Sequence, residues 1–325
     1  MKAYVAYKLP NSIETISQFG VASAYTELTE ALESDNFIFN SFDNQTNYQL
    51  SNLKNCKLSE IEIYFNTDNN VISNQKDYLT NCSELINFLT QNPIDKVILS
   101  RIKKIKNTFN PIELFTALNT LYKNTFNYII SIEGVGTWTG STPEILLTTH
   151  KGNFKTVSIA GTKHSESDNW GNKELEEQQI VTDYIANTLI HNSVKFNQSA
   201  TQTIKAGSVY HLKTTFEGHI QANEFPNLIK ALHPTPATCG LPKTNAQQHI
   251  KKTERHQRKF YTGFLGPTSK ESTNLFVNLR CLEVQKEYSY LYLGGGITSQ
   301  SLPIDEWHET ENKANTLLKA ISSLS

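Results

Sequence analysis

A stretch near the C-terminus, residues 288–313, constrains the chain most, because it joins a strand, a glycine triplet and an acidic helix. Residues 288–293 (YSYLYL) have the composition of a strand, and three glycines follow directly. On the predicted helix, Glu306, Glu309 and Lys313 share one face at about 100° per residue. Two acids and a base beside a bare backbone could hold a divalent cation and an anionic ligand. A solvated helix face with i,i+4 pairing explains the same spacing.

The composition is that of a folded, nearly neutral protein. The 325 residues allow one large domain or two, and 38% of them are hydrophobic, so a sizeable core is possible. No apolar run is long enough to cross a membrane. The formal net charge of −1 argues against a general role in binding nucleic acid or membrane surfaces.

The cysteines point to a reducing compartment. Cys56, Cys82, Cys239 and Cys281 are scattered and form no C-x-x-C motif, so neither a disulfide scaffold nor a zinc site is expected. The N-terminal residues contain no sustained apolar region and do not resemble a secretory signal. We therefore expect a cytoplasmic protein.

Strand-like segments occur in runs with helices between them. Strands are predicted over residues 60–65, 95–101, 126–132, 144–149, 154–160, 201–205, 208–220, 274–284 and 288–293. Helices are predicted over residues 78–89, 111–124, 172–190, 225–232 and 245–259, besides the acidic one. This order favours an α+β protein with large sheets and helices outside, and no composition break divides it.

A second acidic helix is predicted over residues 172–190, where Glu174 and Glu177 repeat the spacing of Glu306 and Glu309. Favourable interaction with a helix dipole explains such acids individually. Two such helices could also face each other and supply one carboxylate each to Mg²⁺, which prefers hard oxygen ligands and often takes only one or two from the protein.

Two further residues are candidates for acid–base chemistry. Lys96 begins an apolar strand and is most simply exposed at the strand end, but burial would favour its neutral amine, which could act as a base. Glu144 ends the turn GSTPE where a strand begins. This is a common place for an acid that faces a cleft, although a turn acid that caps backbone amides is an equal alternative.

Four other residues could border a ligand. Gly161 and Thr162 end a strand, where a small residue lets a ligand approach the backbone. His233 lies in a loop held by two prolines, although a lone histidine is more often structural. Arg280 lies in the apolar segment FVNLRCLEV and needs an anion, from the protein or from a ligand.

Taken in order, nine motifs resemble those of the chorismate-utilising enzymes, which include isochorismate synthases, salicylate synthases and the large subunits of anthranilate and aminodeoxychorismate synthases. The motifs are KVILSR, GSTPE, AGT, KELEEQ, LHPTPATCG, YTGFLG, NLRC, GGGI and EWHETENK. The resemblance covers residues 94–320, while residues 1–93 belong to a part that the family varies. It implies one chorismate-binding domain over residues 1–325, with two large, mostly antiparallel sheets packed face to face and helices outside.

The resemblance also implies roles for the candidate residues around a buried Mg²⁺ site. Glu177 and Glu309 match the metal ligands of the family. Glu174 and Glu306 match the carboxylates that support those ligands. Lys313 and Arg280 match groups that receive the carboxylates of the substrate. The residues that match the pocket wall are Gly161, Thr162, His233 and Gly295.

Two positions distinguish activities within the family. Members that add water carry a lysine where this chain has Lys96, and aminodeoxychorismate synthases carry a lysine where it has Ala160. The resemblance therefore implies a Mg²⁺-dependent isochorismate synthase that uses Lys96 as general base and Glu144 as general acid, acts in menaquinone synthesis, and is a monomer or homodimer. The alternatives are a salicylate synthase, an amine-adding synthase component and a non-catalytic chorismate binder.

Overall fold

The computed structural model describes residues 1–32, 34–68, 70–163, 165–206 and 209–324, without the side chains of 173 and 206. Within these ranges the strands form one continuous hydrogen-bonded sheet in which every pairing is antiparallel. The sheet folds back on itself at the pair formed by its first two strands, so that it has two halves.

The first half contains the strand with Lys96 and the strand with the glycine triplet. Its order is β13 (Gly240–Leu241), β5 (Lys96–Lys106), β17 (Tyr288–Ile297), β16 (Cys281–Val284), β7 (Gly136–Thr142), β6 (Phe126–Ile132) and β1 (Lys2–Lys8). The second half begins at the partner of β1. Its order is β2 (Ile16–Ala24), β4 (Asn47–Asn55), β3 (Asn36–Asn40), β14 (Phe264–Thr268), β15 (Ser272–Val277), β8 (Ile145–His150), β9 (Asn153–Lys163) and β12 (Val209–His219), with β10 (Phe196–Gln198) and β11 (Gln202–Ala206) paired to β12.

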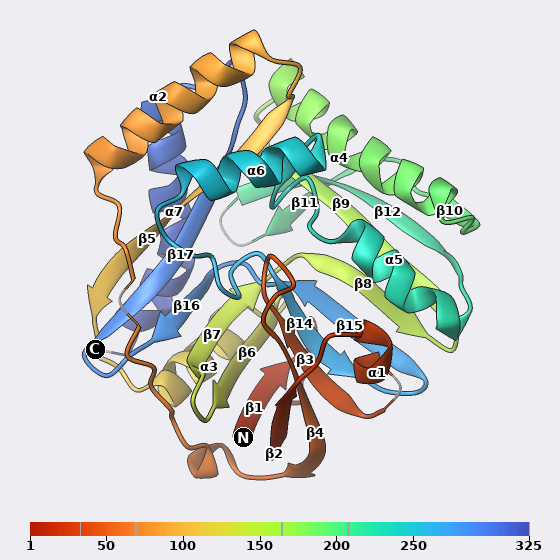
Figure 1. Ribbon diagram of the computed structural model, residues 1–325, viewed down its shortest axis with the longest axis vertical. Coiled ribbons are helices and arrows are strands. Elements are labelled where there is room, and N and C mark those ends of the chain that lie inside the picture. Colours follow the sequence, from red (N-terminus) through yellow and green to blue (C-terminus); the bar gives the residue numbers. More distant parts are fainter. Residues whose placement is uncertain (33, 69, 164, 207–208, 325) are drawn as a thin grey trace.

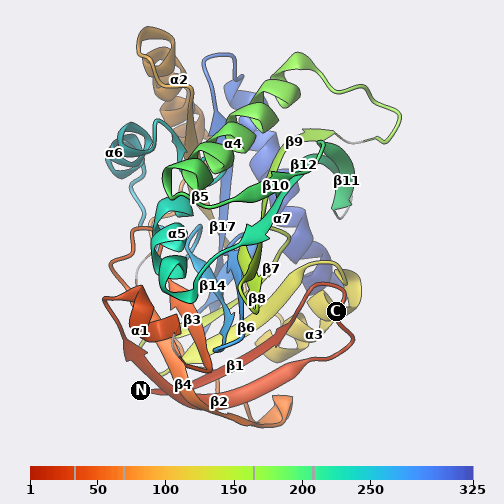
Figure 2. The same ribbon diagram turned by 90° about the vertical axis from the view of Figure 1, so that its right-hand side faces the viewer.

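Helices cover the outside of both halves. They are α1 (Leu28–Leu32), α2 (Gln75–Gln91), α3 (Pro111–Leu121), α4 (Asn172–His191), α5 (Phe225–Leu232), α6 (Lys243–Thr253) and α7 (Pro303–Ser322), with short 3₁₀ turns at Leu58–Glu60 and Ala222–Glu224. Helix α4 packs on β9, α7 on β17, and α2 on α7. Figures 1 and 2 show α2, α4 and α6 at one end of the molecule and β1, β2 and β4 at the other. No helix of the described chain is long and apolar enough to span a membrane.

Aromatic side chains from the two halves meet in the core. Phe126 of β6 stacks on Phe276 of β15 with ring centroids 4.2 Å apart, and Trp138 of β7 contacts Phe39 of β3. All four side chains are almost fully buried, and large aromatic surfaces contribute strongly to such a core. The predicted antiparallel α+β fold is therefore confirmed, and the two sheets that were expected to pack face to face are the two halves of one continuous sheet.

The chain crosses between the halves at two places that matter for the site. Glu144 lies between β7 and β8, and Arg280 lies between β15 and β16. The backbone at Arg280 has φ 48°, in the left-handed region that a non-glycine residue rarely adopts. The single strand predicted over residues 274–284 is therefore wrong, because the chain changes halves at this residue.

The predicted strand over residues 60–65 is also wrong. Backbone groups of this segment form hydrogen bonds with side chains of nearby strands instead of pairing with the backbone of another strand. The amide of Tyr64 donates to Oγ of Ser131 at 2.9 Å, and its carbonyl accepts from Oγ1 of Thr137 at 2.8 Å. Two hydroxyl groups thus hold this segment across the outside of the sheet.

Two other boundaries differ from the prediction, and a third cannot be compared. The helix predicted over residues 245–259 ends at Thr253, because the next residue turns inward and accepts a hydrogen bond from the backbone of β5. The glycine triplet lies inside β17, since that strand pairs with β5 as far as Ile297. Of the strand predicted over residues 208–220, Ser208 lies outside the described residues and β12 begins at Val209.

Candidate active site

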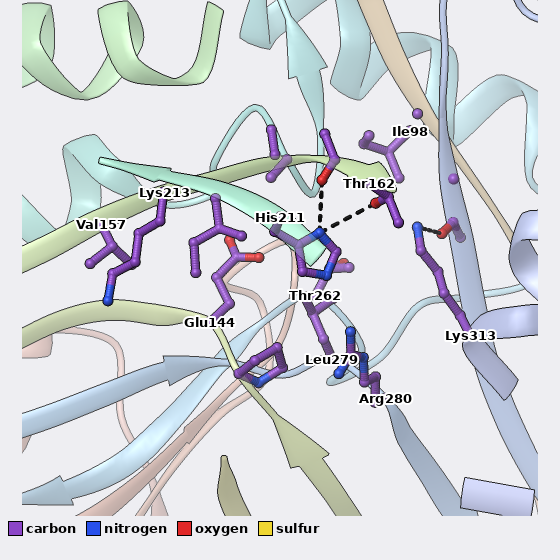
Figure 3. Close-up of a pocket in the computed structure, with 18 of the residues that line it drawn as sticks. Ile98, Glu144, Val157, Thr162, His211, Lys213, Thr262, Leu279, Arg280 and Lys313 are labelled. Carbon is purple, nitrogen blue, oxygen red and sulfur yellow. Dashed lines mark hydrogen bonds between the residues drawn. The ribbon is translucent and has the colours of Figure 1, made fainter. Parts of the chain in front are cut away.

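A cavity of about 450 Å³ lies between β5 and β17 of the first half and β9 and β12 of the second. All predicted site residues except two line it. They are Lys96, Glu144, Gly161, Thr162, Glu174, Glu177, Arg280, Gly295, Glu309 and Lys313. Figure 3 shows Glu144, His211, Arg280 and Lys313 around the same space. Segments distant in sequence therefore converge on one pocket.

Lys96 is buried and is not exposed at the strand end. Only 3% of the residue is accessible, and its ammonium forms an ion pair with Glu177 of α4. The side chain runs over Gly296 of β17, where a Cβ would lie 2.2 Å from Cε of Lys96. The third glycine of the triplet therefore makes room for the lysine.

The carboxyl group of Glu144 faces the cavity from the crossing between β7 and β8. Burial raises its pKa to about 7, and four effects act in the opposite direction: a hydrogen bond from Thr235, and the positive charges of Lys96, Lys313 and Arg280. Oγ1 of Thr235 lies 3.4 Å from Oε1 of Glu144. An acid with this pKa is partly protonated near neutral pH, as a general acid requires.

The two acidic helices meet at the cavity, as the shared spacing of their acids suggested. Glu309 of α7 pairs with Lys313 at 2.6 Å, and the charge of Lys313 holds the pKa of Glu309 below its ordinary value. The nearby charge of Glu177 on α4 raises that pKa, so the two carboxylates interact. Glu174 lies beside Gly161, where a Cβ would be 3.1 Å from Cβ of Glu174.

Oxygen atoms surround Gly295, the central glycine of the triplet. The three heavy atoms nearest to the position of a Cβ on this residue are Oε2 of Glu306 at 3.2 Å, the Tyr78 hydroxyl at 3.8 Å and Oε1 of Glu309 at 3.9 Å. Glu306 is 2% exposed and does not line the cavity itself, and its Oε1 accepts a hydrogen bond from Ser301 at 2.6 Å. The bare backbone thus leaves a small space bordered by hard oxygen donors.

These residues fit the Mg²⁺ that the resemblance implies. Among the described residues no three or more His, Cys, Asp or Glu side chains form a preformed metal cage. Mg²⁺ does not require one, because it usually keeps water and takes one or two protein carboxylates together with ligand oxygens. Glu177 and Glu309 face the cavity and could supply those two.

His211 lines the cavity and was not predicted. Its Nδ1 lies 2.8 Å from the carbonyl oxygen of Gly161 and 3.3 Å from Oγ1 of Thr162 (Figure 3). Burial lowers the pKa of His211 to about 4, so the ring is neutral. The register of β12 against β9 shifts between Tyr210 and Leu212, next to this residue. The local sequence around His211 has the alternation of an ordinary strand, so it did not indicate that this histidine lines a cavity.

His233 does not form the pocket wall, contrary to the expectation. The residue is 2% exposed, its Nε2 lies 3.2 Å from the carbonyl oxygen of Phe42, and its ring packs on Phe264. Burial lowers its pKa to about 3. The proline-containing loop that presents His233 contributes Thr235 to the site instead, through its contact with Glu144.

Known proteins resemble this chain in sequence and in fold. A family profile described as chorismate binding enzyme matches residues 21–322. The isochorismate synthase EntC of Escherichia coli strain K12 is 31% identical over 248 residues, which are 71% of this chain and 63% of that protein. The anthranilate synthase component 1 of Acetivibrio thermocellus is 27% identical over 263 residues, which are 76% of this chain and 53% of that protein. The chain thus aligns with less than two thirds of the length of either relative.

The fold has a close match among solved structures. MenF, the menaquinone-specific isochorismate synthase from Escherichia coli, superposes with a TM-score of 0.85 at 19% sequence identity. The superposition covers 98% of this chain and 88% of the MenF chain. At this identity the likeness concerns the fold.

Proposed function

The chain belongs to the family of chorismate binding enzymes, and from this premise we propose that it is an isochorismate synthase, an isomerase that moves a hydroxyl group on chorismate. The observation that carries the proposal is the meeting of Lys96 and Glu144 in one cavity. Lys96 reaches it from β5 and Glu144 from the crossing between β7 and β8, and a base and an acid on either side of a ring are what this exchange requires.

The proposed reaction takes up one water molecule and releases another. Lys96, in its uncharged form, takes a proton from the water that attacks C2 of the ring. Glu144, protonated, gives its proton to the C4 hydroxyl, which leaves as water while the ring double bonds shift. In the structure the Lys96 ammonium pairs with Glu177, so the working base requires that Glu177 be withdrawn from it.

Two cations are available for the substrate carboxylates. The guanidinium of Arg280 faces the cavity from the crossing between β15 and β16. The ammonium of Lys313 on α7 also lines the cavity and donates to the carbonyl oxygen of Gly294 at 2.9 Å (Figure 3). We assign these two residues to binding and orienting the substrate, because positioned cations recognise carboxylates through charge-assisted hydrogen bonds.

We also propose Mg²⁺ as the cofactor, held by Glu177 and Glu309 with Glu174 and Glu306 supporting them. Its chemistry would be to neutralise the ring carboxylate of the substrate. The support for this proposal is the fit of the oxygen donors around Gly295 and the convergence of the two acidic helices.

The decisive experiment is chromatographic identification of the product formed from chorismate and Mg²⁺ by the purified chain, with and without ammonium. Isochorismate in both conditions supports the proposal. Salicylate with pyruvate would instead identify a salicylate synthase, and an aminated product that needs ammonium would identify an amine-adding enzyme. Ala160 supports water over ammonia as the nucleophile, because amine-adding relatives of one kind have lysine there. No consumption of chorismate at any pH would indicate a binding protein.

Variants assign the two catalytic roles. Lys96→Ala and Glu144→Gln should each lower kcat about 10²- to 10⁴-fold. Lys106→Ala, at the exposed end of the same strand, is the matched control and should leave kcat unchanged. Near-normal turnover at either catalytic position would refute its role. Menaquinone synthesis as the destination of the product remains a prediction, tested by restoration of menaquinone in a bacterium that lacks its own menaquinone-specific enzyme.

A further inference from the structure

Tyr78 lies on α2, in the N-terminal part of the chain for which sequence gave no functional role. The residue is 1% exposed, and its ring packs edge-on against Trp307 of α7 with centroids 5.7 Å apart. Its hydroxyl has no hydrogen-bond partner among the described residues. A buried hydroxyl without a partner is costly, so one that persists calls for an explanation.

The hydroxyl of Tyr78 points at the oxygen-lined space beside Gly295. It is one of the three heavy atoms nearest to the position of a Cβ there, together with Oε2 of Glu306 and Oε1 of Glu309. Ser301 donates to the other oxygen of Glu306, Oε1. Oε2 is therefore the carboxylate oxygen turned toward the space that Tyr78 also borders.

We propose that Tyr78 is a positioning residue of the divalent-cation site, whose hydroxyl donates a hydrogen bond to Oε2 of Glu306 when a cation occupies the space beside Gly295. This inference rests on the proposed function in one respect, namely that a divalent cation binds at this site. Hydrogen bonds to supporting carboxylates orient a metal site and contribute to its affinity. The N-terminal part of the chain would thereby complete a site whose acids all lie on α4 and α7.

Tyr78→Phe tests this role because it removes one oxygen atom and keeps the packing against Trp307. Removing an unpartnered hydroxyl should leave the Tm of the metal-free variant equal to that of the wild type or higher. The variant's affinity for Mg²⁺, measured by titration calorimetry without substrate, should be about 10- to 100-fold weaker. The rise in Tm on adding MgCl₂ should be correspondingly smaller.

Tyr25→Phe is the matched control. The hydroxyl of Tyr25 is also buried, but it donates to Asn40 of β3, which belongs to the second half of the sheet. Its removal should lower the Tm and leave the Mg²⁺ affinity unchanged. Equal Mg²⁺ affinity in wild type and Tyr78→Phe would overturn the role of Tyr78 while leaving the proposed reaction intact. A wild-type chain that binds no Mg²⁺ by either measurement would overturn the cation site and this role together.

Discussion

The Lys96 side chain lies directly against the backbone of Gly296, at a place where a Cβ would come within 2.2 Å of Cε and 2.9 Å of Nζ. The other two glycines of the triplet make room for different groups. A Cβ at Gly294 would lie 2.8 Å from the hydroxyl of Tyr261, and Gly295 faces carboxylate oxygens. The triplet therefore continues β17 while removing three side chains from the wall of the cavity.

Replacing Gly296 with alanine should displace the lysine amine and lower kcat at least about 10²-fold, because small misplacements of a reacting group have effects of this size. The atoms in conflict are the end of a flexible side chain, so the Tm should change little. Steady-state kinetics and thermal unfolding measure the two effects separately.

A double variant isolates the cause of that loss. Adding Gly296→Ala to Lys96→Ala should lower kcat little further, because the glycine acts through the lysine and the two effects are not additive. Full additivity of the two losses would show that Gly296 serves another purpose.

The pH dependence of kcat/KM should contain a descending limb near pH 7. Glu144 must be protonated to act as an acid, and with its pKa raised to about 7 the active form is lost as the pH rises above that value. Activity should fall about tenfold per pH unit beyond the limb. A rate profile from pH 5 to 9 in buffers of constant ionic strength measures it.

Thr235→Val tests the origin of this limb. The hydrogen bond from Thr235 lowers the pKa of Glu144, so its removal should move the descending limb to higher pH. The charges of Lys96, Lys313 and Arg280, which also lower that pKa, remain in the variant. A limb that stays in place or moves to lower pH would contradict the assignment of the limb to Glu144.

Arg280→Lys should weaken substrate binding without weakening the fold. Among the described residues no ion pair of the Arg280 guanidinium occurs, and lysine retains the charge but cannot form a bidentate contact with a carboxylate. Loss of one charge-assisted hydrogen bond, about 1.5–3 kcal/mol, corresponds to a rise in KM of about ten- to a hundredfold. An unchanged KM with a lower Tm would assign Arg280 to the fold instead.

A buried ion pair holds the segment after α6 against the Lys96 strand. Arg258 and Glu254 form two hydrogen bonds of 2.8 and 2.6 Å, and their side chains are 2% exposed. Arg258 also donates to the carbonyl oxygens of Ile98 and Thr238. Arg258→Met should therefore lower the free energy of unfolding by about 3–5 kcal/mol, because it leaves a buried carboxylate without its charge partner. Urea unfolding measures this loss.

The double variant Glu254→Gln with Arg258→Met provides the comparison. Removing both charges should restore part of the stability lost in Arg258→Met, because the main cost is the uncompensated carboxylate. A double variant less stable than the single one would indicate that the hydrogen bond from the Ser100 amide to the charged Glu254 carboxylate outweighs the cost of burying that charge.

Local sequence patterns were sufficient for most of the elements. The helix predicted over residues 172–190 is α4, and Pro111 with the capping side chain of Asn110 marks the start of α3. Cap and periodicity signals depend on neighbours within a few residues, so they can be recognised without the fold. The same patterns failed over residues 60–65, because side chains from strands distant in sequence determine that backbone.

The site could be predicted only where a residue's chemistry was visible in its own motif. Glu177, Glu309 and Lys96 were candidates for that reason, and the tertiary structure then decided that all three face one cavity. His211 and Tyr78 gave no signal, because each is an isolated polar residue whose surroundings come from other elements.

By itself, the sequence determined the longer helices and many of the strands, although not β1 to β4, β7 or β14, and it determined which elements carry acids, bases and glycines, since these properties depend on adjacent residues. Only the tertiary structure decided which side chains meet. The two halves of the sheet fold over each other, so that the crossings at Glu144 and Arg280 come to face β5, and the glycines of β17 leave space between them. These contacts join segments far apart in the chain and depend on packing that no local pattern contains.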